Sequence, residues 1–438
     1  MQRIYKVILL FLVFCMMQKP EFFFIPSSNN TFFGMVGFMF FLFSPNDRRR
    51  ILSNISIGTT PWVRAIMPFV IVAVTAIVVN MSFDLKYIKY IITIFFAFWA
   101  SYLITVVAYR AYGKFELGIF IKYLLTAEII YIFISVLMFF NSSFSDAALS
   151  LLKMDAIMEV AVERTSGLRI LGFGATFFSS GILNGFVLIL LAVYMSQNKF
   201  STFKSTLLYT LYILITVVGM MMARTALVGS AIGLVIIGMN LIKDPKAMIK
   251  TILLIVLVIA VLIFALMRLS AEFAAQLETL FEFAFEMFFN LAESGSMSTS
   301  STDTLMTMYD AIPTTFKSWI IGDAKWDTAT GYYKGTDVGY LRNIWYFGVV
   351  GMGALIYFYY KTLKIIFIER NTGFEKPWLI MLTLFAYVIV LNFKGPADLF
   401  FYVIPLYFIT PSISSEESSV EQEDIGELTE SVEENQSI

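Results

Sequence analysis

WIIGDAKWDTATGYYKGTDVGYLRNIWYFGVVGMG, residues 319–353, joins a long polar segment to a strongly apolar one. Asp337 and Arg342 lie near the point where the sequence changes from polar to apolar. An apolar run of this kind, continued to residue 366, is long enough to cross a bilayer as a helix. The stretch therefore predicts a chain that leaves water and enters lipid, with polar side chains gathered at the boundary.

The composition of the whole chain agrees with this prediction. Of its 438 residues 58% are hydrophobic and 14% are charged, whereas soluble domains have about 45–50% and about 25%. An all-α integral membrane protein is the expected class. The chain has one cysteine, Cys15, and no histidine, which excludes an intrachain disulfide and the usual zinc ligand sets. We expect no metal and no cofactor.

About twelve apolar segments are candidates for membrane-spanning helices. They lie near 4–25, 28–43, 63–80, 88–108, 117–140, 181–196, 205–222, 225–242, 248–267, 343–366, 378–394 and 398–410. Residues 1–410 are thus expected to form one polytopic membrane domain.

The distribution of lysine and arginine over the short loops predicts the orientation. Arg48, Arg49 and Arg50 and most other loop cations fall on one side if both termini are cytoplasmic. Two long loops, 141–180 and 268–342, then lie outside. The tail 411–438 holds nine acidic residues and no basic one, which predicts a disordered cytoplasmic segment.

The outer loop 268–342 is expected to contain short helices. In the first of them, near 269–292, Glu278, Glu282 and Glu286 are four residues apart and share a face. Helices that lie on lipid are usually basic, so this acidic helix is predicted to be a lid lying on the protein or the lipid headgroups. Asp303 is expected to cap the short helix that follows.

Three arginines are candidate diphosphate ligands, because a guanidinium offers a rigid, permanently charged fork that suits phosphate. Arg164 and Arg169 lie in ERTSGLRILGFGATFFSSGILNG, before a membrane segment, and Arg224 lies in MMMARTALVGS between two such segments. Charge at the membrane edge usually has a function. For Arg164 and Arg169 the alternatives are contact with lipid phosphates or pairing with Asp155, Glu159 or Glu163. For Arg224 the alternative is a turn at the outer surface, where a charge has little cost.

The sequence TDVGYLRN provides the candidate reactive groups. Asp337 is a candidate proton acceptor from a sugar hydroxyl, Arg342 a phosphate contact and Tyr340 a further substrate contact. Thr336 or Asp337 is equally well placed to cap the following helix. Gly348 and Gly351 are expected to allow close helix packing.

The sequence has about twelve predicted spans and a late outer loop. It also has an Arg-Thr-Ala turn and an Asp-Val-Gly-Tyr-Leu segment followed by Gly-Val-Val-Gly. Together these features resemble the O-antigen polymerase and ligase superfamily. Within it, the chain is most similar to the Wzy-type polymerases of capsule, exopolysaccharide and O-antigen loci. The residue-level resemblance covers 164–181, 223–230 and 337–351.

This resemblance implies a GT-C-like, metal-independent glycosyltransferase in the bacterial cytoplasmic membrane, acting at the outer leaflet. Donor and acceptor would be undecaprenyl-diphosphate-linked oligosaccharides, with membrane lipids and a chain-length regulator as further partners and no nucleic acid. Family arginines followed by a glycine match Arg164 or Arg169 with Gly174 or Gly181, and the family's mid-chain arginine matches Arg224. Asp337 stands where the ligases carry a histidine, a departure that argues against a ligase.

Two other functions remain open from the residues. A flippase or transporter of lipid-linked oligosaccharides would use Glu128 and Lys122, the ionisable residues within one apolar segment. A non-catalytic assembly protein would leave the three arginines without a role.

Overall fold

Helices form nearly all regular structure in the computed structural model, which describes residues 1–54, 59–153, 162–163, 165, 167–241, 253, 271–296, 298–328, 331–370 and 372–410. Among these residues six helices are long and apolar enough to cross a membrane, and three shorter apolar helices accompany them. The chain is a multi-pass, all-α membrane protein, as expected. The count of twelve spans is not confirmed, and the predicted span 248–267 lies, apart from Leu253, outside the described residues.

The N-terminal helices are α1 (Gln2–Met17), α2 (Asn29–Phe43), α3 (Pro45–Asn54), α4 (Thr59–Asn80), α5 (Lys86–Tyr112) and α6 (Leu117–Phe140). Helix α5 packs along both α1 and α2. A Cβ on Gly34 would overlap the Phe96 carbonyl, so this glycine allows the close approach of α2 to α5. The first predicted span, 4–25, is too long, because Pro20 lacks an N–H and α1 ends at Met17.

The middle of the chain forms α7 (Ser142–Leu149), α9 (Phe177–Gln197), α10 (Thr202–Met222) and α11 (Ala226–Leu241). Helix α9 packs against α10 and α11. Gly185 and Gly229 face each other at the crossing of α9 and α11, where a Cβ on Gly229 would overlap the Gly185 backbone and a Cβ on Gly185 would overlap the Tyr387 hydroxyl. Thr176 and Ser179 form a reciprocal capping box that begins α9.

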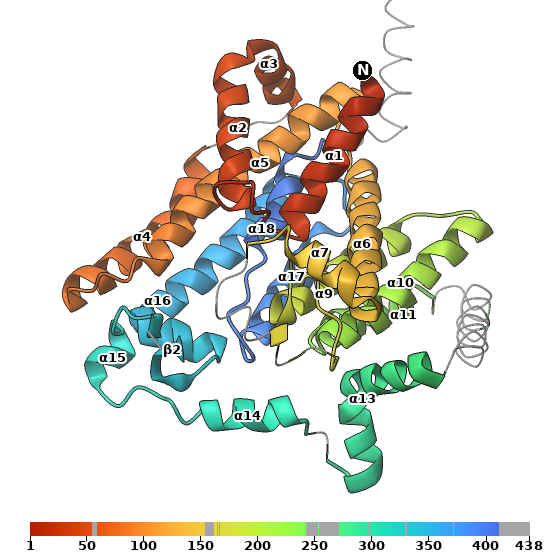
Figure 1. The fold of residues 1–438 in the computed structure, drawn as a ribbon. Helices are drawn as coiled ribbons and strands as arrows, with labels where there is room; N and C mark the ends of the chain where they lie inside the picture. Colours follow the sequence, from red (N-terminus) through yellow and green to blue (C-terminus); the bar gives the residue numbers. More distant parts are fainter. Residues whose placement is uncertain are drawn as a thin grey trace, which may run out of the picture.

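The second long loop contains α13 (Ala271–Ser294), α14 (Ser300–Met308), α15 (Phe316–Ile320), the hairpin strands β1 (Asp327–Thr328) and β2 (Gly331–Tyr332), and the turn η1 (Tyr333–Gly335). These elements lie along the lower edge of the molecule in the view of Figure 1, opposite α3 and the N-terminus. The predicted cap of α14 is wrong: the Thr299 hydroxyl accepts from the Thr302 N–H, and Asp303 sits within the first turn.

The C-terminal part forms α16 (Gly339–Lys364), η2 (Ile365–Glu369), α17 (Pro377–Leu391), α18 (Phe400–Val403) and η3 (Ile404–Phe408). Gly348 has φ 70° and interrupts the regular path of α16; a Cβ there would overlap Ile320 of α15. The predicted span 398–410 is not one long helix. The α-helix changes to a 3₁₀ turn next to Pro405, and residues 400–409 are buried among other helices.

The loops meet in two groups at opposite ends of the bundle. At one end Arg110 pairs with Asp47 at 2.5 Å, and the Thr410 N–H donates to Phe115 O at 2.8 Å. At the other end the Asn80 amide donates to Gly322 O at 3.1 Å, and the Ser82 hydroxyl donates to Ala324 O at 2.6 Å. Segments expected on the same side of the membrane thus lie at the same end, and which end faces the cytoplasm stays a prediction.

Candidate diphosphate-binding site

Two of the predicted arginines lie side by side at the end that holds the long loops. Arg169 belongs to the segment that precedes α9, and the N–H of the next residue, Ile170, donates to Met221 O at 3.1 Å. Met221 lies in the last turn of α10, and Arg224 follows in the turn to α11. This backbone contact brings together two guanidinium groups from separate sequence motifs.

The ring of Phe283, on α13, contacts both guanidinium groups. Its centroid lies 4.7 Å from the Arg224 guanidinium carbon and 5.9 Å from that of Arg169. Arg169 also lies 4.3 Å from the centroid of Phe177. Such contacts stabilise a cation that is partly removed from water. They fix the two side chains without neutralising their charge.

Lys394 adds a third cation to this place. It lies in the loop between α17 and α18, which Asn392 shapes by donating to Val388 O at 2.8 Å and Ala397 O at 3.0 Å. Burial and the positive charges of Arg224 and Arg169 lower the pKa of Lys394, while Asp337 opposes this shift. The three cations are therefore within electrostatic range of one another.

The three cations line one cavity of about 440 Å³. Its other walls are aromatic, small or hydroxyl side chains, namely Phe177, Phe178, Ala223, Thr225, Phe283, Ser300, Ser301 and Thr304. A cavity with clustered cations beside apolar rings suits an anionic group attached to an apolar or sugar moiety. Another cavity, of about 340 Å³, lies between α9, α11 and α17, but its charged lining residues, Glu375 and Lys376, have opposite signs.

The positive charge of this cavity is only partly neutralised. Arg224 pairs with Glu286 of α13, whereas Arg169 and Lys394 form no ion pair within the part of the chain that the structure describes. The alternative in which Arg169 pairs with Glu163 is thus not seen. Burial and the charge of Arg224 lower the pKa of Arg169. A bound anion would relieve this mutual repulsion.

Arg342 belongs to a different cluster. Its guanidinium lies 2.6 Å from an Asp327 carboxylate oxygen, 3.4 Å from one of Asp337, and 3.1 Å from the Trp326 carbonyl. The rings of Trp326 and Tyr332 lie 4.0 Å and 4.4 Å from its carbon. Only 6% of this side chain is exposed. The Arg342 guanidinium, which is predicted to contact phosphate, is therefore already paired with two carboxylates and packed against two rings.

Asp337 connects the two clusters. Burial raises its pKa, and the positive charges of Arg342 and Lys394 counteract the rise. It does not cap α16, because the N-cap residue is Val338, whose N–H donates to the Thr336 hydroxyl at 3.3 Å. A partly exposed carboxylate with a raised pKa can accept a proton more readily than an ordinary aspartate. Its predicted role as proton acceptor stays a prediction.

The remaining predicted residues are placed as follows. The Tyr340 hydroxyl donates to Ile389 O at 2.7 Å, so it holds the end of α17. Arg164 lies outside the described residues. Glu128 is fully buried and accepts from the Gln18 amide at 3.1 Å, while Lys122 on the same helix is exposed.

Sequence reasoning missed Lys394, Phe283 and Glu286 as members of the cavity region. The sequence patterns assign no role to Lys394 or Phe283, and they predict Glu286 only as part of an acidic helix face. The LNFKGP motif, in which a lysine and a glycine follow the end of an apolar helix, was the available signal for Lys394. No local signal links Glu286 to Arg224, because 62 positions separate them.

Comparisons with known proteins give no relative from which a role could be transferred. No family model, curated protein or solved structure matches the chain.

Proposed function

We propose that the protein is a glycosyltransferase that lengthens a polysaccharide on a lipid carrier. A growing glycan would pass from undecaprenyl diphosphate to the next undecaprenyl-diphosphate-linked repeat unit at the outer leaflet of the bacterial cytoplasmic membrane. The observation that carries this proposal is the single cavity lined by Arg169, Arg224 and Lys394 at the end of the bundle that holds the long loops. The resemblance to Wzy-type polymerases suggests the same chemistry.

In the proposed reaction the acceptor hydroxyl oxygen forms a bond to the anomeric carbon of the donor glycan. The bond between that carbon and the diphosphate oxygen breaks, and the carrier diphosphate leaves with the electron pair. Arg169, Arg224 and Lys394 would stabilise the negative charge that develops on the leaving group. Asp337 would take the hydroxyl proton and pass it to water.

We assign Arg342 to positioning Asp337 rather than to phosphate binding. Its two ion pairs and its burial between two rings leave little of the guanidinium accessible to a ligand. A carboxylate that is fixed by a buried arginine keeps one orientation, which favours a defined path for the proton. Tyr340 would act similarly, by fixing the α17 end next to Lys394.

The test is reconstitution of the purified protein with lipid-linked repeat units, with product length resolved on a gel. Wild type should produce a ladder of lengthened chains, and Arg169→Ala and Arg224→Ala should stop at single units. Lys317→Ala is the matched control, because Lys317 is an exposed cation of the second long loop and lies outside the cavity. Full-length ladders from properly inserted Arg169→Ala and Arg224→Ala would refute the proposal.

The transporter alternative receives less support from the described residues. Glu128 and Lys122 share a helix but not a surface, since one is buried against Gln18 and the other is exposed. The two functions differ in what accumulates when the gene is deleted. Single repeat units on the outer leaflet fit a polymerase, whereas units retained at the inner leaflet fit a flippase.

A further inference from the structure

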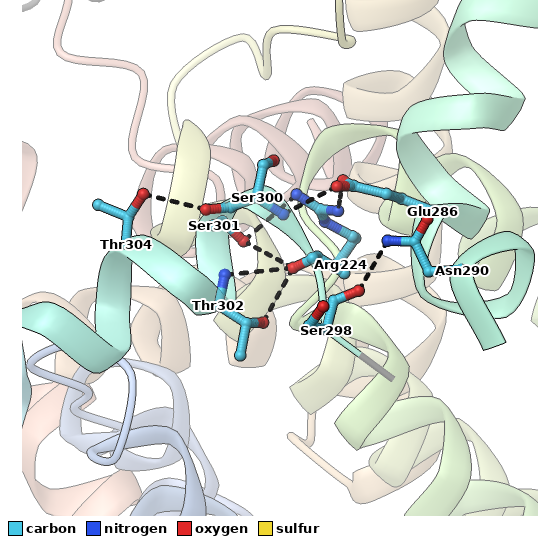
Figure 2. A network of polar contacts seen from close by, with 9 residues as sticks. Arg224, Glu286, Asn290, Ser298, Ser300, Ser301, Thr302 and Thr304 are labelled. Carbon is cyan, nitrogen blue, oxygen red and sulfur yellow. Dashed lines mark hydrogen bonds and ion pairs between the residues drawn. The ribbon is translucent and has the colours of Figure 1, made fainter. Parts of the chain in front are cut away.

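Glu286 enters the cation cluster from the lid helix α13. One of its carboxylate oxygens pairs with the Arg224 guanidinium, and the other accepts from the Ser300 N–H at 2.8 Å (Figure 2). The two other acids of the same helix face, Glu278 and Glu282, are exposed, and no ion pair is recorded for either within the described ranges. Glu286 thus differs from the other two acids of this helix face in forming an ion pair.

The two donors that hold this carboxylate are those that proteins use for phosphate. Arg224 supplies a guanidinium, and Ser300 supplies a backbone N–H in the first turn of α14, where it has no acceptor within the helix itself. An arginine fork and the amides at a helix N-terminus both favour a negatively charged oxygen group. The carboxylate of Glu286 is therefore in the position of an anionic ligand, at the edge of a cavity that contains two further cations.

The same contact holds the lid in place. Arg224 also donates to the Ser301 hydroxyl at 3.2 Å, and the Asn290 amide donates to Ser298 O at 2.8 Å (Figure 2). The first bond joins the start of α14 to the turn between α10 and α11, and the second joins the end of α13 to the segment that precedes α14. Release of Glu286 would remove an ion pair on which this attachment depends.

Glu286 stays charged in this arrangement. Burial alone raises its pKa, but the hydrogen bond from the Ser300 N–H and the Arg224 guanidinium outweigh burial, and the pKa lies below its usual value. At neutral pH the carboxylate is thus an anion that competes with any other anion for Arg224.

We propose that Glu286 occupies Arg224 and the α14 amide while the cavity is empty, and that the substrate diphosphate displaces it. The diphosphate then takes Arg224 together with Arg169 and Lys394, and the α13–α14 lid is released from the α10–α11 turn. This inference rests on the proposed function, since it deepens the way in which the same cavity recognises its diphosphate. It assigns Glu286 as an internal anion that competes with the substrate diphosphate for Arg224.

Binding of farnesyl diphosphate to the full chain in nanodiscs tests this exchange. Glu286→Gln should tighten binding by roughly threefold to tenfold, because the competing internal charge is removed while the side-chain shape is kept. Glu282→Gln is the matched control, because it removes the same charge one turn earlier at an exposed position. It should leave the dissociation constant unchanged, and farnesol should bind wild type and Glu286→Gln equally.

Each outcome decides between two roles for Glu286. Weaker binding by Glu286→Gln would mean that Glu286 orients Arg224 for the ligand, and an unchanged constant would mean that no exchange occurs; either result overturns the inference. If Arg224→Ala weakens farnesyl diphosphate binding and the wild-type protein lengthens chains, the proposed function survives that failure. If no chain lengthening occurs with lipid-linked repeat units, the proposed function itself fails.

Lid release has its own readout. Spin labels at the exposed positions Asp303 of α14 and Met81 at the end of α4 report the position of the lid. In wild type, farnesyl diphosphate should broaden or shift the distance distribution, and Glu286→Gln should show the shifted distribution without ligand. An identical distribution in all three samples would overturn the release step.

Discussion

The Arg342 cluster and the Arg169–Arg224–Lys394 cavity use the same kind of side chain for opposite purposes. Arg342 has two carboxylates and two rings around it, and its charge is balanced. In the cavity, Arg224 pairs with Glu286, whereas no ion pair is seen for Arg169 or Lys394 among the described residues. A paired and buried arginine stabilises the fold, whereas a cation without a carboxylate partner can bind an anionic ligand. The difference lies in the partners and not in the residue type.

Substitution of Arg342 should have the largest effect on stability. Arg342→Ala leaves Asp327 and Asp337 without their cation and removes two ring contacts, so we expect a loss of about 3 kcal/mol in the free energy of unfolding. This is the lower end for a broken buried pair, because 54% and 37% of the two aspartate side chains are exposed. Thermal unfolding in detergent measures it.

The matched variant Arg169→Ala should change the unfolding temperature little, since Arg169 has no ion pair among the described residues. If both variants destabilise the protein equally, the distinction between a structural and a ligand-binding arginine is wrong.

Substitution of Arg224 should have the largest effect on binding. Arg224→Ala should weaken farnesyl diphosphate binding by roughly 30-fold to 150-fold, from about 2–3 kcal/mol for hydrogen bonds to a charged group. Arg224→Lys should recover part of this, because lysine keeps the charge but loses the fork. Titration calorimetry in nanodiscs checks both values. A Lys variant equal to Ala would show that geometry, and not charge, dominates.

The sequence predicted the general architecture because that depends on local properties. Twenty apolar residues require a helix in lipid, and rare charges at the membrane edge indicated Arg169 and Arg224. Proline at 20 and at 405 explains why α1 and the last apolar segment are shorter than their hydrophobic runs. These breaks could have been read from the sequence if proline had been weighed against length.

The membership of the cavity could not be predicted, because it depends on contacts between distant segments. Glu286 and Arg224 are 62 positions apart, and Lys394 lies in a third segment. Arg342 looked accessible in TDVGYLRN, since its partner Asp327 belongs to a hairpin that no apolar pattern indicates. Sequence patterns showed which charges are unusual, but not which of them are already paired.

The pH dependence of binding should identify Lys394 as a member of the cation cluster. Burial and two neighbouring arginines lower its pKa, so Lys394 loses its proton at a lower pH than an ordinary lysine does. Anion affinity is then greatest below that pKa and falls as the pH rises through it. We expect up to about a tenfold fall, and none of it in Lys394→Arg, because arginine stays protonated. Affinity measured between neutral and alkaline pH decides this. The same fall in Lys394→Arg would exclude Lys394 as its cause.

The smallest effect should come from Tyr340, and its size separates a substrate contact from a loop support. Tyr340 and Tyr309 support the segment around Lys394 from two sides: the first donates to Ile389 O at 2.7 Å and the second to Phe393 O at 2.5 Å. Tyr340→Phe and Tyr309→Phe should each cost about 1 kcal/mol of stability and weaken farnesyl diphosphate binding by less than about fivefold. If Tyr340 instead touches the ligand, only Tyr340→Phe will weaken binding, and Tyr309→Phe will not. Equal effects in the two variants would show that Tyr340, like Arg342, supports the structure around the site and does not contact the ligand.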